Sequence, residues 1–218
     1  MVKFISAAEA ALFFEDNQSI MIGGFLKCGS PTMVIEELLK TPVKNLTLIG
    51  NDTSLPNSDR GKLICAYKIK KAIVSHIGTN PETVAQMNSG QLEVELTPQG
   101  SLAERIRAGG AGLGGILTPT GVGTDVAAGK QIINVDGTDY ILEKPLKADI
   151  ALVYATHADR FGHLSFFGST RNFNAIMPFA AKLVIVEADY LHDEPLDPNN
   201  VIVPGIVVDY IVAKEKVK

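Results

Sequence analysis

The sequence predicts an α/β protein with a mainly parallel central sheet, helices on both faces of that sheet and one β-hairpin excursion. Short apolar runs alternate with amphipathic stretches along the 218 residues, a pattern typical of βαβ units. Glycine or other turn residues close several of these runs, as expected where buried parallel strands end. No linker, low-complexity segment or clear repeat divides the chain, so we expect a single domain over residues 1–218.

The first expected elements are a helix, a strand and a second helix. Residues 4–14 place alanine and phenylalanine on one face, as in an amphipathic helix. Residues 19–22 form a short apolar run that ends at Gly23 and Gly24, which favours a buried strand. Ser30 is a good N-cap and Pro31 suits the first helical position, so the second helix is expected to begin there.

The remaining elements follow from the same signals. Ser101 and Glu104 have the capping-box spacing and predict a short helix, and Asp136-Gly137 between two apolar runs predicts a hairpin. The strands expected from apolar runs are residues 46–49, 72–74, 92–96, 131–135, 138–142, 149–155, 164–167 and 183–186, with a helical stretch near 175–181 and a solvated tail at 214–218.

Composition excludes several classes of function. The 20 basic and 24 acidic residues give a net charge of −4, without the clustered positive face of a general nucleic-acid binder. No apolar run approaches the roughly 20 residues of a membrane span, and the N-terminus has no signal-peptide pattern. Cys28 and Cys65 form no disulfide framework, and neither they nor the histidines have metal-ligand spacing. We therefore expect a cytoplasmic protein without a metal, a membrane contact or a nucleic-acid partner.

The segment 20–31 is the most informative part of the chain. A buried strand runs into glycines and then into a helix, a geometry that directs free backbone N–H groups at one point, where a pyrophosphate can bind. Ser30-Pro31 stands where a P-loop needs Lys-Ser/Thr, and no Gly-x-Gly-x-x-Gly fingerprint occurs. A tight turn without any ligand is the alternative that the pattern leaves open.

A longer run that contains this segment, residues 16–31, resembles without a gap the signature of family I coenzyme A transferases. Residues 96–100, 104–112, 117–124 and 170–174 resemble the A (α) subunit of that family, and residues 75–82 are similar to its bacterial acetate/acetoacetate and butyrate–acetoacetate enzymes. The resemblance covers nearly the whole chain. It implies a fold related to that of sugar-phosphate isomerases.

The resemblance also implies a reaction and a partner. Coenzyme A moves between a short-chain acyl-CoA and a free carboxylate, through a glutamyl–CoA thioester on a B (β) subunit, in a heterodimer or an A2B2 heterotetramer. Acyl-CoA is then a substrate, and no permanently bound cofactor is expected. Aligning the B-subunit pattern with this chain puts Asn51 at the position of the glutamate. Because Asn51 cannot form an acyl anhydride, no nucleophile is expected on this chain. The neighbouring Asp52 is the nearest other carboxylate, and a turn-forming role is favoured for it over a role as nucleophile.

Three parts of the chain are candidates for contact with a substrate or a partner: a glycine turn, Gln99 and Arg171. The resemblance implies that coenzyme A binds the glycine turn, although the turn could instead shape the subunit junction. Gln99 lies between a predicted strand and a predicted helix, where its amide could stabilise negative charge on the thioester oxygen, or it is a polar loop residue. Arg171 stays open between a structural salt bridge and contact with a carboxylate or a partner. The turn consists of Gly23, Gly24, Phe25, Leu26, Lys27, Cys28 and Gly29.

Two other functions remain as alternatives. A sugar-phosphate isomerase of related fold would need its own carboxylate base and a phosphate clamp, which Asn51 and the missing lysine argue against. A non-catalytic protein that binds coenzyme A or acyl-CoA, or has a regulatory role, would need no partner. The acyl pair stays undetermined, because one methylene changes binding in a pocket by only about 1–3 kcal/mol.

Overall fold

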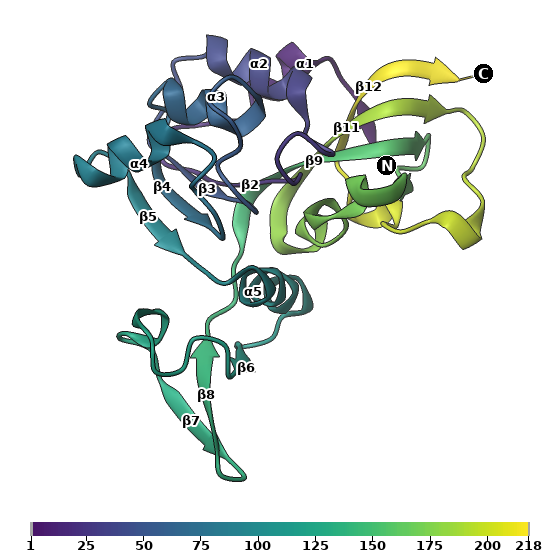
Figure 1. Cartoon of the computed structure of the whole chain (residues 1–218). Coiled ribbons are helices and arrows are strands. Elements are labelled where there is room, and N and C mark those ends of the chain that lie inside the picture. The colour runs from purple at the N-terminus through teal and green to yellow at the C-terminus, as the bar shows by residue number, and fades with distance from the viewer. Residues whose placement is uncertain (1, 218) are drawn as a thin grey trace.

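The central feature of the computed structural model, which describes residues 2–217, is a nine-stranded sheet (Figure 1). Its order is β1-β12-β11-β9-β2-β3-β4-β5, and all of these pairings are parallel, while β10 pairs antiparallel with β9. The predicted mainly parallel sheet is therefore confirmed. The strands are β1 (Lys3–Phe4), β2 (Ser19–Ile22), β3 (Leu46–Ile49), β4 (Ile69–Val74), β5 (Glu93–Leu96), β9 (Ala148–Asp159), β10 (Leu164–Ser165), β11 (Ala181–His192) and β12 (Tyr210–Val217).

Helices cover both faces of this sheet, as predicted. Successive side chains of β2 point to opposite faces of the sheet. Ile20 and Ile22 pack in the hydrophobic cluster that includes α2 and α3, and Met21 packs in the cluster that includes α5. The α-helices are α1 (Ala7–Ala11), α2 (Thr32–Lys40), α3 (Asp59–Cys65), α4 (Pro81–Asn88) and α5 (Gln99–Ala111), and the 3-10 turns are Asp125–Ala127, Gly168–Arg171, Phe173–Ala175, Met177–Ala180, Pro198–Asn200 and Gly205–Val207.

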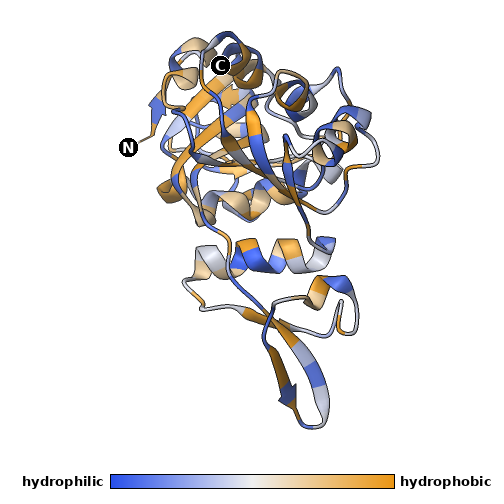
Figure 2. Ribbon diagram, turned by 90° about the vertical axis from the view of Figure 1, so that its left-hand side faces the viewer, coloured by the Kyte–Doolittle hydropathy of each residue, from blue (hydrophilic) through white to orange (hydrophobic). Residues whose placement is uncertain are grey.

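A small antiparallel sheet lies apart from the main body, with α5 between them (Figures 1 and 2). It contains β6 (Ile116–Thr118), β7 (Ile132–Val135) and β8 (Thr138–Glu143) in the order β6-β8-β7. Asp136 and Gly137 both have positive φ, as a two-residue hairpin turn between β7 and β8 requires. The predicted hairpin is thus confirmed.

Several predicted boundaries were wrong. Phe4 belongs to β1, which pairs with β12, and the first helix covers only Ala7–Ala11 after a capping box at Ser6. The start of the third predicted helix was also wrong, because α5 begins at Gln99 rather than at Ser101. Residues 175–181 form short 3-10 turns and the start of β11, and residues 214–217 extend β12 instead of forming a tail. The helices α3 and α4 were not predicted.

The start of α2 also differs from the expectation. Ser30 is not its N-cap; the Ser30 hydroxyl donates to the carbonyl oxygen of Leu26, and α2 begins at Thr32. The carboxylate of Glu187, which is buried on β11, accepts from the backbone N–H groups at the start of this helix, at 3.0 Å from Thr32 and 2.7 Å from Met33. A side chain from a distant strand therefore caps α2 and compensates its N-terminal dipole.

Within residues 2–217, no helix combines the length and the apolar character that a bilayer crossing requires.

Candidate active site

The candidate site lies at the carboxyl ends of β2, β3, β4 and β5. The loops after these strands surround a cavity of about 420 Å³, lined among others by Phe25, Asn51, Ser75, His76 and Gln99. In open α/β sheets, ligands bind in the crevice outside the carboxyl ends of the strands. The structure thus brings together the glycine turn, Asn51 and Gln99, which sequence analysis selected separately.

Side-chain amides form a connected chain in this cavity. The Asn51 side chain is almost fully buried, and its Nδ2 donates to Asp52 Oδ2 at 2.7 Å. Its Oδ1 accepts from Gln99 Nε2, and its backbone carbonyl accepts from the Ser75 hydroxyl at 2.6 Å. Because a carboxylate can only accept, the donor to Asp52 must be the amide nitrogen, and this fixes the orientation of Asn51. Gln99 has a second N–H, which is free of an acceptor among the described residues.

Asp52 is held by a buried ion pair. Arg60 Nη2 lies 2.9 Å from Asp52 Oδ1, and both side chains are at most 2% exposed. Burial alone would raise the pKa of Asp52, but the charge of Arg60 and hydrogen bonds from Leu26, Asn51 and Ser54 outweigh it, so the pKa lies below its ordinary value. Asp52 is therefore an ionised structural carboxylate whose oxygens are already engaged.

Arg60 also fixes the glycine turn. Its Nη1 and Nη2 donate to the carbonyl oxygens of Gly23 and Gly24 at 2.9 and 3.2 Å, and its Nε donates to the carbonyl of Asp52 at 2.7 Å. One buried guanidinium thus joins the loops after β2 and β3. Sequence analysis missed this residue, and no local pattern around it gives a signal.

The glycines of the turn are required by close packing within the chain. A Cβ on Gly23 would stand 1.7 Å from Asn174 Oδ1, and one on Gly29 would stand 2.8 Å from the carbonyl oxygen of Thr170. Gly24 and Gly29 also have positive φ, which other residues rarely adopt. The Asn174 side chain donates to the carbonyl of Gly29 at 2.8 Å, which secures the turn against residues 170–174.

Most backbone N–H groups of the turn are already bonded. Gly24 donates to Asn172 Oδ1 at 3.1 Å, Leu26 donates to Asp52 Oδ2 at 3.0 Å, and Phe25 and Cys28 bond each other. Glu187 occupies the N–H groups at the start of α2 in the same way. The expected cradle of free N–H groups is therefore wrong for these positions. Exposed side chains instead mark the tip, where Phe25 is 47% exposed and Lys27 is exposed.

Two further cavities adjoin the first along α5. One of about 470 Å³ shares Phe25 and Gln99 with it and is also lined by Arg107 and Arg171. A third of about 280 Å³ shares Arg107 with the second and reaches Ala111 at the end of α5. The three cavities therefore follow one another along this helix.

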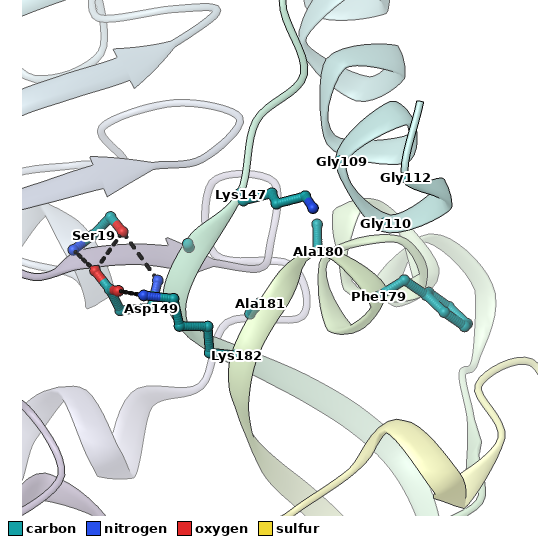
Figure 3. A pocket seen from close by; sticks show the side chains of 11 residues that line it. Ser19, Gly109, Gly110, Gly112, Lys147, Asp149, Phe179, Ala180, Ala181 and Lys182 are labelled. Atoms are coloured by element: carbon teal, nitrogen blue, oxygen red, sulfur yellow. Dashed lines mark hydrogen bonds and ion pairs between the residues drawn. The ribbon is translucent and has the colours of Figure 1, made fainter. Parts of the chain in front are cut away.

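Another cavity, of about 440 Å³, lies at the opposite edge of the sheet, where β2, β9 and β11 begin (Figure 3). Two of its charged groups pair: Asp149 accepts from Ser19 and lies 2.8 Å from Lys182. Hydrogen bonds from Lys182 and Ser19 lower the pKa of Asp149 to about 2. The Lys147 side chain points toward the carboxyl end of α5, where a positive charge is favourable. The polar contacts in this cavity therefore connect the starts of β2, β9 and β11.

Other reactive side chains near the site have no catalytic partner. Cys28 Sγ lies 3.2 Å from the Ser169 hydroxyl, which is no base for a thiol nucleophile. His76 lies in the first cavity beside Asn51. Over residues 2–217, no three His, Cys, Asp or Glu side chains are placed to hold a metal ion. Gly109, near the end of α5, packs closely against Leu146. It does not line the first cavity.

Comparison with known proteins shows what the chain resembles. The family model of coenzyme A transferases matches residues 4–214. The acetoacetyl-CoA:acetate/butyrate CoA transferase alpha subunit of Clostridium acetobutylicum is 50% identical over 211 residues, covering 96% of this chain and 97% of that protein. The acetate CoA-transferase subunit alpha of Escherichia coli K12 is 46% identical, covering 99% of both chains.

Solved structures share the fold at low sequence identity. An acyl-CoA transferase from Escherichia coli O157:H7, in a thioester complex with CoA, has a TM-score of 0.85 and 22% identity over 98% of this chain. This chain spans 50% of the length of that one. The glutaconate coenzyme A-transferase of Acidaminococcus fermentans has a TM-score of 0.83 and 20% identity, covering 97% of this chain and 75% of that chain.

Proposed function

This chain belongs to the coenzyme A transferase family as one of its α subunits, and we propose that it supplies half of an active site which a β subunit completes. The reaction moves coenzyme A between a short-chain acyl-CoA and a free carboxylate. The names of the two relatives specify acetoacetate, acetate and butyrate, and we propose acids of this group as substrates here. Acyl-CoA enters as a substrate from the cytoplasm, and the cycle uses no resident cofactor.

The observation that carries this proposal is the state of Asp52. Among the described residues that line the first two cavities, Asp52 is the one carboxylate, and Arg60 together with three donors occupies its oxygens. A carboxylate that attacks a thioester needs a free oxygen lone pair directed at the carbonyl carbon. Asn51, at the end of β3, cannot supply one. The family resemblance implies a glutamate on the B subunit, and we propose that this glutamate is the nucleophile.

The proposed chemistry has two steps in each direction. The partner's glutamate attacks the thioester carbonyl, expels the thiolate of coenzyme A and forms an acyl–glutamyl anhydride. The thiolate then attacks the glutamyl carbonyl, which releases the acyl group as a carboxylate and leaves a glutamyl–CoA thioester. The incoming acid reverses both steps. Because the energy of the thioester bond is conserved, the reaction needs neither ATP nor a metal. Water must be excluded, because it would hydrolyse the anhydride and the thioester.

Two parts of this chain would act on the substrate. We propose that the second N–H of Gln99 donates to the thioester oxygen as negative charge develops there, since Asn51 already fixes the position of its amide. We also propose that coenzyme A contacts the glycine turn through its exposed tip, Phe25 to Cys28. Gly23, Gly24 and Gly29 then hold the tip in place against the body of the subunit.

The test is co-expression of this chain with its candidate β subunit, an assay of coenzyme A exchange, and reduction of the acyl-CoA-treated enzyme with borohydride before peptide mass spectrometry. We expect exchange only when both chains are present, and a modified glutamate on the partner. Exchange by this chain alone, with the modification on Asp52, would refute the proposal. Binding of acyl-CoA by this chain without any exchange in the assembly would favour the alternative of a non-catalytic binding protein.

A variant of Asn51 tests whether this residue positions Gln99 or reacts itself. Asn51→Ala in the assembled enzyme is expected to slow exchange without abolishing it, because Asn51 positions Gln99 and does not react. Complete loss of exchange in a correctly assembled Asn51→Ala enzyme would show that Asn51 takes part in the chemistry directly.

A further inference from the structure

The three adjoining cavities form a groove along α5 that the proposed chemistry uses only at one end. The first cavity holds Asn51 and Gln99, the second adds Arg107 and Arg171, and the third extends to Ala111. Arg107 follows Gln99 by about two helical turns, which corresponds to roughly 12 Å at 1.5 Å per residue. The whole of α5 from Gln99 to Ala111 spans about 18 Å on the same scale. The groove is thus elongated.

Arg171 is unusual among the arginines of this groove and its surroundings. Arg60 pairs with Asp52, and Arg105 pairs with Glu95. Arg171 is exposed at the second cavity and, within residues 2–217, makes no ion pair. The structural salt bridge that the sequence left open for Arg171 is therefore not formed within this part of the chain.

Arg107 contributes a second guanidinium to the same cavity. It makes one contact with a carboxylate, since its Nε lies 3.0 and 3.2 Å from the two oxygens of Glu104 one turn earlier on α5. This pair is about half exposed, and Glu104 is outside the lining of the cavity. Arg107 Nη1 and Nη2 remain available as donors.

Besides the two arginines and the polar residues Gln99 and Asn172, the second cavity is lined by apolar side chains. Ala103 from α5 and Phe173, Ala175 and Ile176 from the opposite segment line it. A cavity lined by two arginines and several apolar side chains suits a ligand with an uncharged stem and an anionic group. Guanidinium binds phosphate oxygens in a planar, bidentate geometry, which makes phosphate a good match for this pair.

We propose that this α5 groove binds the extended arm of coenzyme A, with Arg107 and Arg171 holding its phosphate groups. The inference rests on the proposed function. The separation along α5 distinguishes phosphate from the other substrate anion. The carboxylate of a short-chain acid must react near Gln99, so it cannot at the same time reach Arg107, about 12 Å farther along α5. Coenzyme A is long enough to place its thioester at Gln99 and its phosphates at the arginines.

The experiment uses the enzyme assembled with its β subunit and measures KM for acyl-CoA, KM for the acid, and kcat. In Arg171→Gln and in Arg107→Gln, we expect KM for acyl-CoA to rise roughly 10-fold, with kcat and KM for the acid within about twofold of wild type. Arg171→Lys should recover part of the affinity. Lys40→Gln, at the exposed carboxyl end of α2, removes a charge away from the groove and serves as the control.

A second arm identifies the phosphate. The substrate is then the acyl thioester of dephospho-CoA, which lacks the 3′-phosphate. Little effect of Arg171→Gln on KM for this thioester assigns Arg171 to the 3′-phosphate, and an increase as large as that for acyl-CoA assigns it to the diphosphate. An unchanged KM for acyl-CoA overturns the proposal. So does a rise in KM for the acid alone, or dissociation of the two chains, which would make Arg171 an interface residue.

Calorimetric titration with coenzyme A separates this inference from the proposed function. If the wild-type assembly binds coenzyme A but exchanges nothing, the proposed function fails, while weaker binding by Arg171→Gln still supports the groove. If the assembly exchanges coenzyme A normally and the variants bind it as wild type does, the groove assignment fails and the proposed function stands.

Discussion

At the scale of single residues, the site depends on hydrogen bonds whose direction is determined. Asp52 accepts from Asn51, Asn51 accepts from Gln99, and this order leaves one N–H of Gln99 pointing into a cavity. In the function proposed above, a neutral donor at this position stabilises developing negative charge without attracting the partner's carboxylate in the ground state. On that proposal, the chain of amides is preorganised for a transition state and not for a charged substrate.

Removal of the Gln99 amide is expected to reduce kcat. Gln99→Leu in the assembled enzyme should lower kcat on the order of 100-fold with little change in KM, because the donor acts on charge that develops in the transition state. Steady-state kinetics of exchange measures both quantities. Gln91→Leu, in the turn before β5, is the matched control and should leave kcat unchanged. Equal loss in kcat and affinity for Gln99→Leu would indicate a binding role instead.

The Asp52–Arg60 pair predicts a pH dependence of stability. Asp52→Asn removes the carboxylate that lies 2.9 Å from the buried Arg60 and should lower the free energy of unfolding at pH 7 by about 3–5 kcal/mol. The pKa of Asp52 is lowered in the folded state relative to about 3.9 in the unfolded chain. Ionised Asp52 therefore favours folding above pH ~4, and this contribution is lost as the pH falls through the folded-state pKa.

Denaturant unfolding at several pH values measures how the contribution of Asp52 to stability changes with pH. The difference between wild type and Asp52→Asn should be constant from pH 7 to about 5 and should shrink below pH ~4. Glu187 has a raised pKa, because burial outweighs its hydrogen bonds, but it is common to both proteins and cancels in the difference. The exposed Asp193→Asn is the control. A difference that grows on acidification would contradict the assignment.

At the scale of elements, the position of α5 depends on close backbone contact. A Cβ on Gly109 would stand 1.9 Å from the carbonyl oxygen of Leu146, in the segment that leads into β9. A Cβ on Gly110 would stand 2.7 Å from the Cβ of Phe179. These glycines let the helix lie against two segments at once, and the groove along α5 follows from that placement.

Substitutions at two glycines of this one helix should have opposite effects. Gly109→Ala must push α5 away from Leu146 and should lower the free energy of unfolding by about 2–3 kcal/mol. Gly100→Ala meets no atom within 4 Å and should raise it by a few tenths to about 1 kcal/mol, through the higher helix propensity of alanine. Chemical denaturation measures both. Similar values for the two variants would show that the contact with Leu146 does not constrain the helix.

At the scale of the whole molecule, the sequence predicts contacts that follow from topology better than contacts between distant side chains. Asn51 and Gln99 each follow a strand of a parallel sheet, so their meeting at one edge was predictable. Glu187 caps α2 from 153 to 155 positions away, and no local pattern indicates this. Nothing near Arg60 in the sequence identifies it as fully buried, because its partners come from the loops after β2 and β3.

The two helices that were not predicted, α3 and α4, show a second reason why prediction from sequence was incomplete. Asn80 and Pro81 form an N-cap and a first helical residue, a signal that was present and would have predicted α4. The other missed helix, α3, contains Gly61, which destabilises a helix in isolation. The structure explains this glycine, because a Cβ there would stand 2.0 Å from the carbonyl oxygen of Leu55. Tertiary packing therefore overrides local propensity in α3.

The small sheet is connected to the body through one buried arginine. Arg105 on α5 lies 2.6 Å from Glu95 of β5 and 3.7 Å from Glu143 of β8, and its Nε donates to the carbonyl of Lys144. Lys130 pairs with the other oxygen of Glu143 at 2.7 Å. Most residues of β6 and β7 are partly or fully exposed, so packing alone provides little protection against opening. The network around Arg105 should therefore control the stability of this sheet.

Arg105→Met tests this control by amide hydrogen exchange. The variant leaves Glu143 with one partner fewer in a buried position and should lower the local opening free energy by about 3 kcal/mol, so that β6 and β8 exchange roughly 100-fold faster. The long strands β9 and β11 should keep most of their protection. Arg107→Met, on the exposed side of α5, is the matched control and should leave β6 and β8 unchanged. Equal acceleration in β9 and β8 would mean that Arg105 stabilises the whole chain instead of joining its two parts.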